Sequence, residues 1–315
     1  MSYFLFNKPL VTKNEFIRHI CCIKSLIMKK IIFTISTILI SAFSFAQDFQ
    51  GMAVYESKTS TADFKSRMEE NKDITPEMRK MIEERMKSVF EKTFFLNFDK
   101  SASIYKEEEK LEAPGTQGGG FRMMGSMMGG GGTHYKNIKE KTFAIDKEMM
   151  GKEFLIQDTL PNLKWKLSQE TKQIGDYLCF KATTTQKATK SDFRNFRMKK
   201  AEENKDKKPT TDIMKEGELP KEIEVVAWYT PEIPVSTGPE NYQGLPGLIL
   251  EVSAGKTTIL CSKVVMNVKD KKEIKAPNKG KVVTQKEYDE IVTKKMEELR
   301  EMNQGRGGMQ MRIGG

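Results

Sequence analysis

Histidine and cysteine are scarce in this chain of 315 residues. It has two histidines and four cysteines, and His19 and two of the cysteines lie within the first 46 residues. It also lacks the HExxH, CxxC, P-loop and GxSxG patterns that mark zinc proteases, redox thiols, nucleotide sites and serine hydrolases. A histidine-based triad would have to use His134, which follows a glycine-rich stretch unsuited to a rigid catalytic base. Although acids are numerous enough for a carboxylate pair, we expect no enzymatic activity.

The first residues have the order of a secretory signal peptide. A charged start at Met28 precedes the apolar run Ile31 to Phe45, and Ala46 ends a small-x-small cleavage site. We expect cleavage after Ala46 and a location in the periplasm or outside the cell. The alternative is an uncleaved anchor, but the run is shorter than the roughly 20 residues of a membrane span. Because signal peptides start close to their apolar run, we interpret Met28 as the true start and residues 1–27 as an upstream extension.

The basic charge is modest once this leader is set aside. The leader holds six of the 53 basic residues and one of the 43 acids, so the formal net charge falls from +10 to +5. Lysine and glutamate alternate along most charged runs, which is typical of a solvated surface rather than of a nucleic-acid footprint. We therefore expect a soluble protein that binds no nucleic acid and does not span the membrane after cleavage.

Two cysteines follow the leader, Cys179 and Cys261, and both lie in strand-like runs. In an oxidising compartment they would form a disulfide if their Cα atoms come within roughly 7 Å. The alternative is a pair of buried thiols that act as small apolar side chains. The sequence does not decide between the two.

Apolar periodicity predicts about nine strands and two helices, without a βαβ alternation. One helix follows Thr75 and carries a stripe of methionines that we expect to pack on the core, with a partner-binding face as the alternative. The other starts at Thr284, which has the spacing of a capping box with Glu287. The predicted class is α+β: a large curved antiparallel sheet, as a half-open barrel or β-clam, with one or two packed helices. The strands are expected at 51–58, 94–98, 101–105, 152–157, 164–168, 177–185, 222–229, 248–252 and 257–268.

Composition divides the rest of the chain. We predict one domain over 47–303, interrupted by flexible insertions at 112–133 and 188–220, and a disordered tail at 304–315. Within the second insertion, Arg194 to Glu203 has the composition of a helix.

The stretch Trp228 to Leu250 is the most distinctive part of the sequence. Its prolines and glycines define a series of turns that leads into a strand. The hexapeptide Gly244-Leu245-Pro246-Gly247-Leu248-Ile249 and the run Ile174-Gly175-Asp176-Tyr177-Leu178-Cys179 resemble the GLPGLI family, secreted proteins of Bacteroidetes without an established activity. The resemblance covers about residues 152–268. Leu245, Leu248 and Ile249 are expected in the core, with the glycines serving the turn, although a rim or gate is the alternative.

The order of elements is similar to that of the curved-sheet lipoprotein carriers of Gram-negative envelopes. Fold alone does not define function. The resemblance implies a periplasmic binding protein or carrier for an apolar ligand, or a partner of another envelope protein. It implies no cofactor.

A second hypothesis comes from the methionines. Met123, Met124, Met127 and Met128 lie within six residues, and His134 follows closely. Thioether sulfur is a soft ligand that suits Cu(I), and a glycine-rich loop can wrap around an ion without strain. The alternative function is therefore Cu(I) binding by this loop, although methionine also serves as an adaptable surface contact or an oxidant sink.

Overall fold

The structure is a computed structural model that describes residues 49–70, 74–109, 131–195, 197–198, 217–218, 220–268 and 272–305. All of these residues fall in one compact unit of the chain, which begins at Phe49. The predicted signal peptide, the four clustered methionines, most of the 188–220 insertion and residues 306–315 lie outside the described residues.

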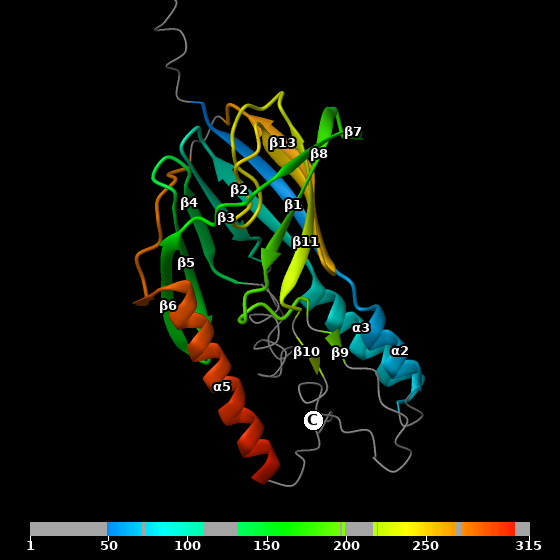
Figure 1. Cartoon of the computed structure of the whole chain (residues 1–315). Helices are drawn as coiled ribbons and strands as arrows, with labels where there is room; N and C mark the ends of the chain where they lie inside the picture. Colours follow the sequence, from blue (N-terminus) through cyan, green and yellow to red (C-terminus); the bar gives the residue numbers. More distant parts are fainter. Residues whose placement is uncertain are drawn as a thin grey trace, which may run out of the picture. The chain divides into compact units, whose positions relative to one another are not determined.

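A single sheet of twelve strands dominates the described part of the chain (Figure 1). Its order is β14-β6-β5-β4-β3-β2-β1-β13-β12-β11-β8-β7, and a separate two-stranded sheet pairs β10 with β9. Every pairing is antiparallel except that of β14 with β6. The strands of the large sheet are β1 Gly51–Thr59, β2 Glu91–Phe98, β3 Ala102–Glu107, β4 Thr133–Asn137, β5 Thr142–Met149, β6 Lys152–Thr159, β7 Lys166–Ile174, β8 Tyr177–Lys187, β11 Glu222–Thr230, β12 Leu248–Ala254, β13 Thr257–Met266 and β14 Lys281–Val283; the small sheet joins β9 Arg197–Met198 to β10 Gly217–Glu218.

The predicted fold class is wrong. The protein is mostly β, with an open sheet that is mixed rather than antiparallel, so neither the α+β class nor the antiparallel half-open barrel or β-clam describes it. The error has two causes. Strands β4, β5 and β14 were not recognised from periodicity, and the parallel pairing of β14 with β6 joins residues more than a hundred positions apart, which no local pattern reveals. The helix expected from Arg194 to Glu203 is also wrong where it is described, because Arg197–Met198 is strand β9.

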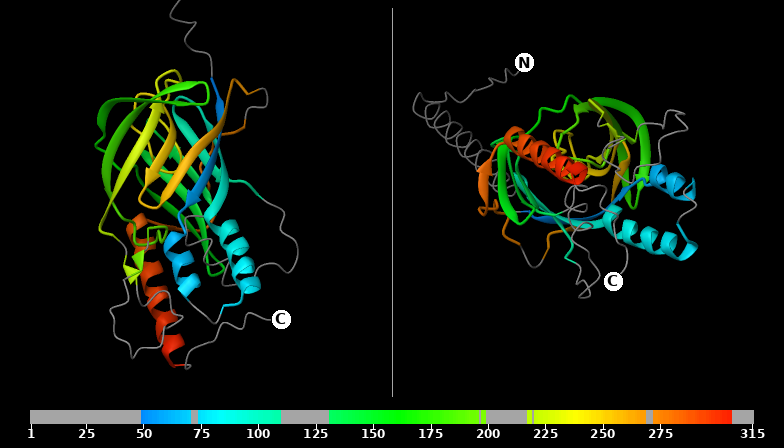
Figure 2. Two further views of the ribbon diagram at one scale, coloured as in Figure 1. Left: turned by 90° about the vertical axis from the view of Figure 1, so that its right-hand side faces the viewer. Right: turned by 90° about the horizontal axis from the view of Figure 1, so that it is seen from below.

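Three helices accompany the sheet in the described residues. Helix α2, Ala62–Glu70, was not predicted. Helix α3, Pro76–Phe90, begins as expected after Thr75, whose hydroxyl accepts a hydrogen bond from the Met78 amide. Helix α5, Gln285–Gly305, has the predicted capping box, because Thr284 and Glu287 exchange hydrogen bonds. Helix α3 contacts β1 and β2, and α5 contacts β6 (Figure 2).

The methionine stripe of α3 packs on the sheet only at its C-terminal end. Met86 and Val89 are buried, whereas Met78, Met81 and Ile82 are half-buried. We expected the whole stripe to pack on the core, but only the residues in its last turns are buried.

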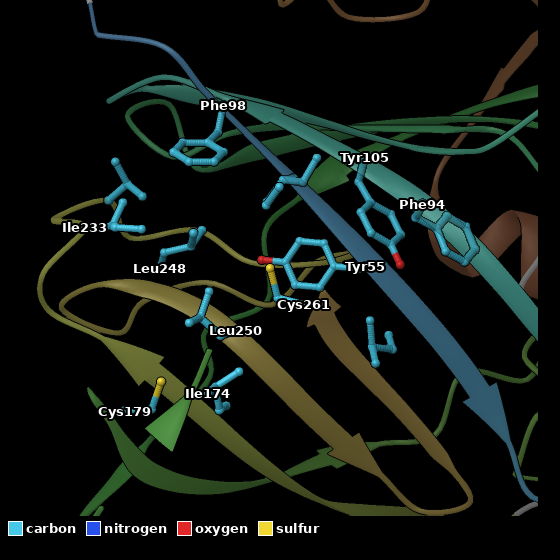
Figure 3. Close-up of a cluster of buried hydrophobic side chains, with 14 residues drawn as sticks. Tyr55, Phe94, Phe98, Tyr105, Ile174, Cys179, Ile233, Leu248, Leu250 and Cys261 are labelled. Carbon is cyan, nitrogen blue, oxygen red and sulfur yellow. The ribbon is translucent and has the colours of Figure 1, made fainter. Parts of the chain in front are cut away.

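Three buried clusters fill the face of the sheet that we call the inner face, which carries Tyr55 and Tyr105. The largest cluster joins β1, β2 and β3 to the segment after β11, and Figure 3 shows Ile233, Leu248 and Leu250 packed in it with Tyr55. A second cluster lies between β8, β11 and β12. The third joins β5 and β6 to α5. Of the described helices, α5 alone contributes side chains to one of these clusters.

A candidate polar binding site on the inner face

The first four residues of the GLPGLI motif end a segment, Pro231–Gly247, that connects β11 to β12, and the last two begin β12; we call Pro231–Gly247 the signature segment. Its backbone returns on itself, because the Ile249 amide donates to the Thr237 carbonyl. The indole of Trp165 also donates to the Gln243 carbonyl over 2.8 Å. Leu245, Leu248 and Ile249 are at most 1 % exposed, so these side chains are core residues, as expected, rather than parts of a gate.

Lys136, on β4, forms hydrogen bonds with the signature segment. Its side chain is fully buried, and its ammonium donates to the carbonyls of Gly238 and Tyr242 over 2.5 and 3.0 Å. Burial lowers the pKa of Lys136 to about 7, with a smaller opposing effect from Glu240. The inner face therefore contains a lysine that loses its proton far more easily than a surface lysine.

This lysine leads to a pH-dependent prediction. In the unfolded chain Lys136 keeps its proton up to its ordinary pKa of 10.5, so above about pH 7 the unfolded state binds more protons than the folded state. The free energy of unfolding should therefore rise between about pH 7 and about pH 10.5. Urea denaturation should show a flatter rise for Lys136→Met, while Lys139→Met, at an exposed position, should follow the wild type. Equal slopes for wild type and Lys136→Met would contradict the assignment.

Residues 188–195, which we call the bridging segment, place a second group of charges next to the signature segment. Arg194 binds Asp192 through two nitrogens, with the Nη2 to Oδ2 distance at 2.6 Å, and also binds both oxygens of Glu240. The Arg194 and Glu240 side chains are each only 14 % exposed. Burial opposes the charge of Arg194, but Asp192 and Glu240 outweigh it and hold the Arg194 pKa well above its usual range. Glu240 adopts a φ of 47°, in the left-handed region that few residues other than glycine occupy.

The bridging segment is anchored at two further points. The Ser191 hydroxyl donates to Asp289 on α5, over 2.7 Å. Asn195 accepts a hydrogen bond from the Lys256 amide in the turn between β12 and β13. The start of the insertion predicted at 188–220 is thus an ordered bridge between α5, the signature segment and the sheet.

Three polar side chains from adjacent strands face this charged group. Tyr105 on β3 is directly paired with His134 on β4, and His134 is paired with Ile145 on β5. Lys147 lies two residues beyond Ile145, on the same face of the sheet. We call Tyr105, His134 and Lys147 the inner polar row.

Each member of the inner polar row has a polar atom without a hydrogen-bond partner in the described part of the chain. The Tyr105 hydroxyl and the His134 Nδ1 are buried and unpartnered. Lys147 makes no hydrogen bond or ion pair to a described residue, and its ammonium lies 6.0 Å from the Tyr288 ring centre. Burial, with Lys147, Arg194 and Lys136 nearby, holds the pKa of His134 well below its usual value, so this imidazole is neutral. Burial raises the pKa of Tyr105 and lowers that of Lys147.

A small cavity of about 30 Å³ borders the same charged group. Its lining includes Asp192, Arg194, Glu240, Tyr242 and Gln186. One water molecule needs roughly 10–15 Å³ by such a measure, so there is room for two or three water-sized groups. The rest of its lining includes Ile223, Val252 and Ile259, so the cavity has a polar and an apolar side, and no member of the inner polar row lines it.

Of the five residues predicted to bind Cu(I), the structure describes His134 alone. His134 lies on β4, and its ring centre is 6.1 Å from that of Tyr105 on the neighbouring strand. The four methionines lie outside the described residues. Among the described residues, no group of three or more histidine, cysteine or acidic side chains has the arrangement of a metal site. Sequence reasoning missed Tyr105, Lys136, Lys147 and Arg194. The one available signal was the alternation of His134 and Lys136, which are the two inward positions of a five-residue strand.

Cys179 and Cys261 are both free and buried. They belong to one cluster, but β8 and β13 are separated by β11 and β12 in the sheet (Figure 3). Burial raises the pKa of each thiol to about 11. In this arrangement they serve as small apolar side chains, one of the two alternatives left open by the sequence.

Among the described residues, no helix has the length and apolar character required to cross a membrane.

Comparison with known proteins gives a family match for part of the chain. Residues 165–251 match a family model described as "Protein of unknown function (Porph_ging)". The matched range contains the GLPGLI hexapeptide and Cys179, and it leaves out the inner polar row. No curated protein matches the chain.

Two solved structures are similar at low identity. "Structure of PNGF-II in C2 space group" is 12% identical with a TM-score of 0.43, and "Structure of PNGF-II in P21 space group" is 13% identical with the same TM-score. In both comparisons the match covers 78% of this chain and 33% of the other, so this chain spans about a third of the length of those proteins.

Proposed function

We propose that this protein is a non-catalytic binding protein that works outside the cytoplasm and holds a small polar ligand at the inner polar row. The observation that carries the proposal is the pair of unpartnered polar atoms, the Tyr105 hydroxyl and the His134 Nδ1, that are buried on the inner face. Leaving a buried polar group without a partner costs about 1–3 kcal/mol. Most buried polar atoms have a hydrogen-bond partner, so we expect these atoms to bind ordered water or a ligand.

The location and the absence of catalysis in this proposal rest on the sequence. The leader that ends at Ala46 has the parts of an export signal. His134 is the sole histidine after that leader, and within the described residues it makes no hydrogen bond to a serine, a cysteine or a carboxylate. A general base needs a partner that orients it, so binding is the function that these residues support best.

A polar ligand is favoured over the two alternatives from the sequence. An apolar ligand would need an open apolar groove, whereas side chains of three clusters fill the described inner face. Cu(I) would receive a single described ligand, His134, and three cations beside it, Lys147, Arg194 and Lys136, oppose a positive ion. No observation on the described residues favours copper.

Two buried tyrosines provide a matched test. Tyr105→Phe keeps the stacking on Phe94, at 4.6 Å, and removes only the unpartnered hydroxyl. We expect it to stabilise the ligand-free protein by about 1 kcal/mol, a rise in Tm of about 2–4 °C. Tyr55→Phe removes a hydroxyl that donates to the Ile249 carbonyl over 2.7 Å, and it should destabilise the protein by about 1 kcal/mol.

Ligand binding is tested by measuring the Tm of each variant with acetate, acetamide or glycerol added as a probe. A probe that raises the Tm of the wild type should lose its effect in Tyr105→Phe and keep it in Tyr55→Phe. A loss of stability in ligand-free Tyr105→Phe would show that the hydroxyl already has a partner inside the protein, and the proposed site would be rejected.

A further inference from the structure

The two ends of the twelve-stranded sheet differ in length and exposure. At one end β14 has three residues and is followed directly by α5. At the other end β7 has nine residues, and among the described residues it pairs with β8 alone (Figure 1). Seven of the nine residues of β7 are exposed. A long edge of this kind is a ready template for pairing with another strand.

The backbone of β7 directs part of its hydrogen-bonding groups toward this open edge. Gln173 on β7 lies directly opposite Leu178 on β8. The Leu178 amide donates to the Glu232 side chain over 3.1 Å rather than to β7. Gln173 and Leu178 are therefore a non-hydrogen-bonded pair, in which each backbone points away from the other strand. By the same alternation, the backbone groups of Thr171 also point away from β8.

Two charges of opposite sign lie on one face of β7 beside the open edge. Glu170 pairs with Lys181 of β8 over 2.9 Å, and Lys172 pairs with Glu251 over 2.6 Å. Lys181 is directly opposite Trp228, and the Lys172 ammonium lies 5.5 Å from the Trp228 ring centre. The bulge in β7 therefore leaves Glu170 and Lys172 on the same face. Their side chains are 60% and 44% exposed, so each has room for a further charged partner.

The order of these charges favours one way of pairing two copies of β7. In an antiparallel pair of identical strands, opposite residues share a face, so a two-fold axis must pass through a residue. An axis at Thr171 places Glu170 of each copy opposite Lys172 of the other. An axis at Glu170 would oppose the two Glu170 side chains. An axis at Gln169 would oppose Lys166 and Lys172, and like charges directly opposite each other are destabilising.

We propose that β7 pairs with β7 of a second copy of this chain, antiparallel and with the two-fold axis at Thr171, so that the two sheets become one. This inference goes beyond the proposed ligand binding and does not depend on it. Charges of alternating sign then cross the junction in the order Lys181, Glu170, Lys172 of the second copy and Glu251 of the second copy. The paired segment is short, so we expect a weak dimer with a Kd of roughly 1–100 µM.

Sedimentation equilibrium of the purified protein, over concentrations that span this Kd, tests the pairing. Glu170→Lys places a lysine opposite Lys172 at both ends of the pair, and Thr171→Pro removes the amide at its centre. Each should weaken the dimer about tenfold or more. The proline is compatible with the pairing to β8, because the Thr171 amide points away from that strand. Glu224→Lys, at an exposed position on β11, is the matched control and should dimerise as the wild type does.

Mixing two charge variants tests the register itself. Glu170→Lys opposes lysines across the axis, and Lys172→Glu opposes glutamates, so neither variant should dimerise alone. In the mixture every facing pair has opposite signs, and a heterodimer should form with a Kd within about tenfold of the wild-type value. Because Lys172→Glu also places an acid near Glu251, circular dichroism checks that it folds. If it does not fold, Glu170→Lys and Thr171→Pro still decide the proposal.

Three results would overturn the second copy as the partner of β7. The first is a wild type that stays monomeric over the whole range; if an added peptide with the sequence of residues 164–176 then raises its Tm, the edge accepts an extended peptide instead. The second is a dimer whose Kd is unchanged in both Glu170→Lys and Thr171→Pro, because such a dimer uses another surface. The third is a mixture of two folded charge variants that stays monomeric, which contradicts the axis at Thr171.

Discussion

Replacing Arg194 with alanine is expected to lower the free energy of unfolding by about 3–5 kcal/mol. The substitution leaves two buried carboxylates, Asp192 and Glu240, without the guanidinium that satisfies them. The two carboxylates then lie beside each other in a site with little water, where like charges repel strongly. It also cuts the direct link between the bridging segment and the signature segment. Urea denaturation of the purified protein measures the loss.

Two comparisons separate this charge effect from lost packing. In the triple variant Asp192→Asn, Arg194→Met and Glu240→Gln no charge remains unpaired, so it should recover most of the stability lost in Arg194→Ala. At the surface, Lys181 pairs with Glu170, which is 60% exposed, and Lys181→Ala should cost less than about 1 kcal/mol. A triple variant as unstable as Arg194→Ala would show that the loss comes from packing rather than from unpaired charge.

Replacing Gly247 with alanine is expected to cost about 3 kcal/mol, at the upper end of the range for overpacking. A Cβ atom at this position would lie 2.0 Å from the Thr230 carbonyl oxygen and 2.6 Å from its carbon. Both are backbone atoms at the end of β11, so they cannot move aside as a flexible side chain would. The second glycine of the GLPGLI motif is thus required for the close approach of the signature segment to β11.

The first glycine of the motif is the matched control. Gly244 has a φ of 93°, and a Cβ there would meet the Trp165 ring at an ordinary 3.7 Å. Asparagine tolerates positive φ better than other side chains, so Gly244→Asn should cost about 1 kcal/mol or less. If Gly247→Ala proves as mild as Gly244→Asn in thermal or urea unfolding, the close contact with Thr230 is not what the motif serves.

Local features of the fold were well predicted from sequence because they depend on neighbouring residues. Alternation along 51–58 gave strand β1, and the Thr284 and Glu287 spacing gave the start of α5. The same approach failed for β4 and β5, where polar residues occupy inward positions: His134, Lys136 and Lys147 break the apolar alternation that identifies a half-buried strand. Two of the three strands that carry the candidate site, β4 and β5, were therefore missed by the sequence pattern.

The amino-acid sequence by itself determined a β-rich chain, two capped helices, and a proline- and glycine-rich segment that the family model also matches. These follow from backbone preferences and side-chain periodicity, which act over a few residues. Only the tertiary structure decided the class of the sheet and the place of its charges. It pairs β14 with β6 in parallel, and it brings Arg194 of the bridging segment into contact with Glu240 of the signature segment. The physical reason is that a buried charge is tolerated when another group pairs with it. Here the partners come from segments far apart in the sequence, so no local pattern reveals them.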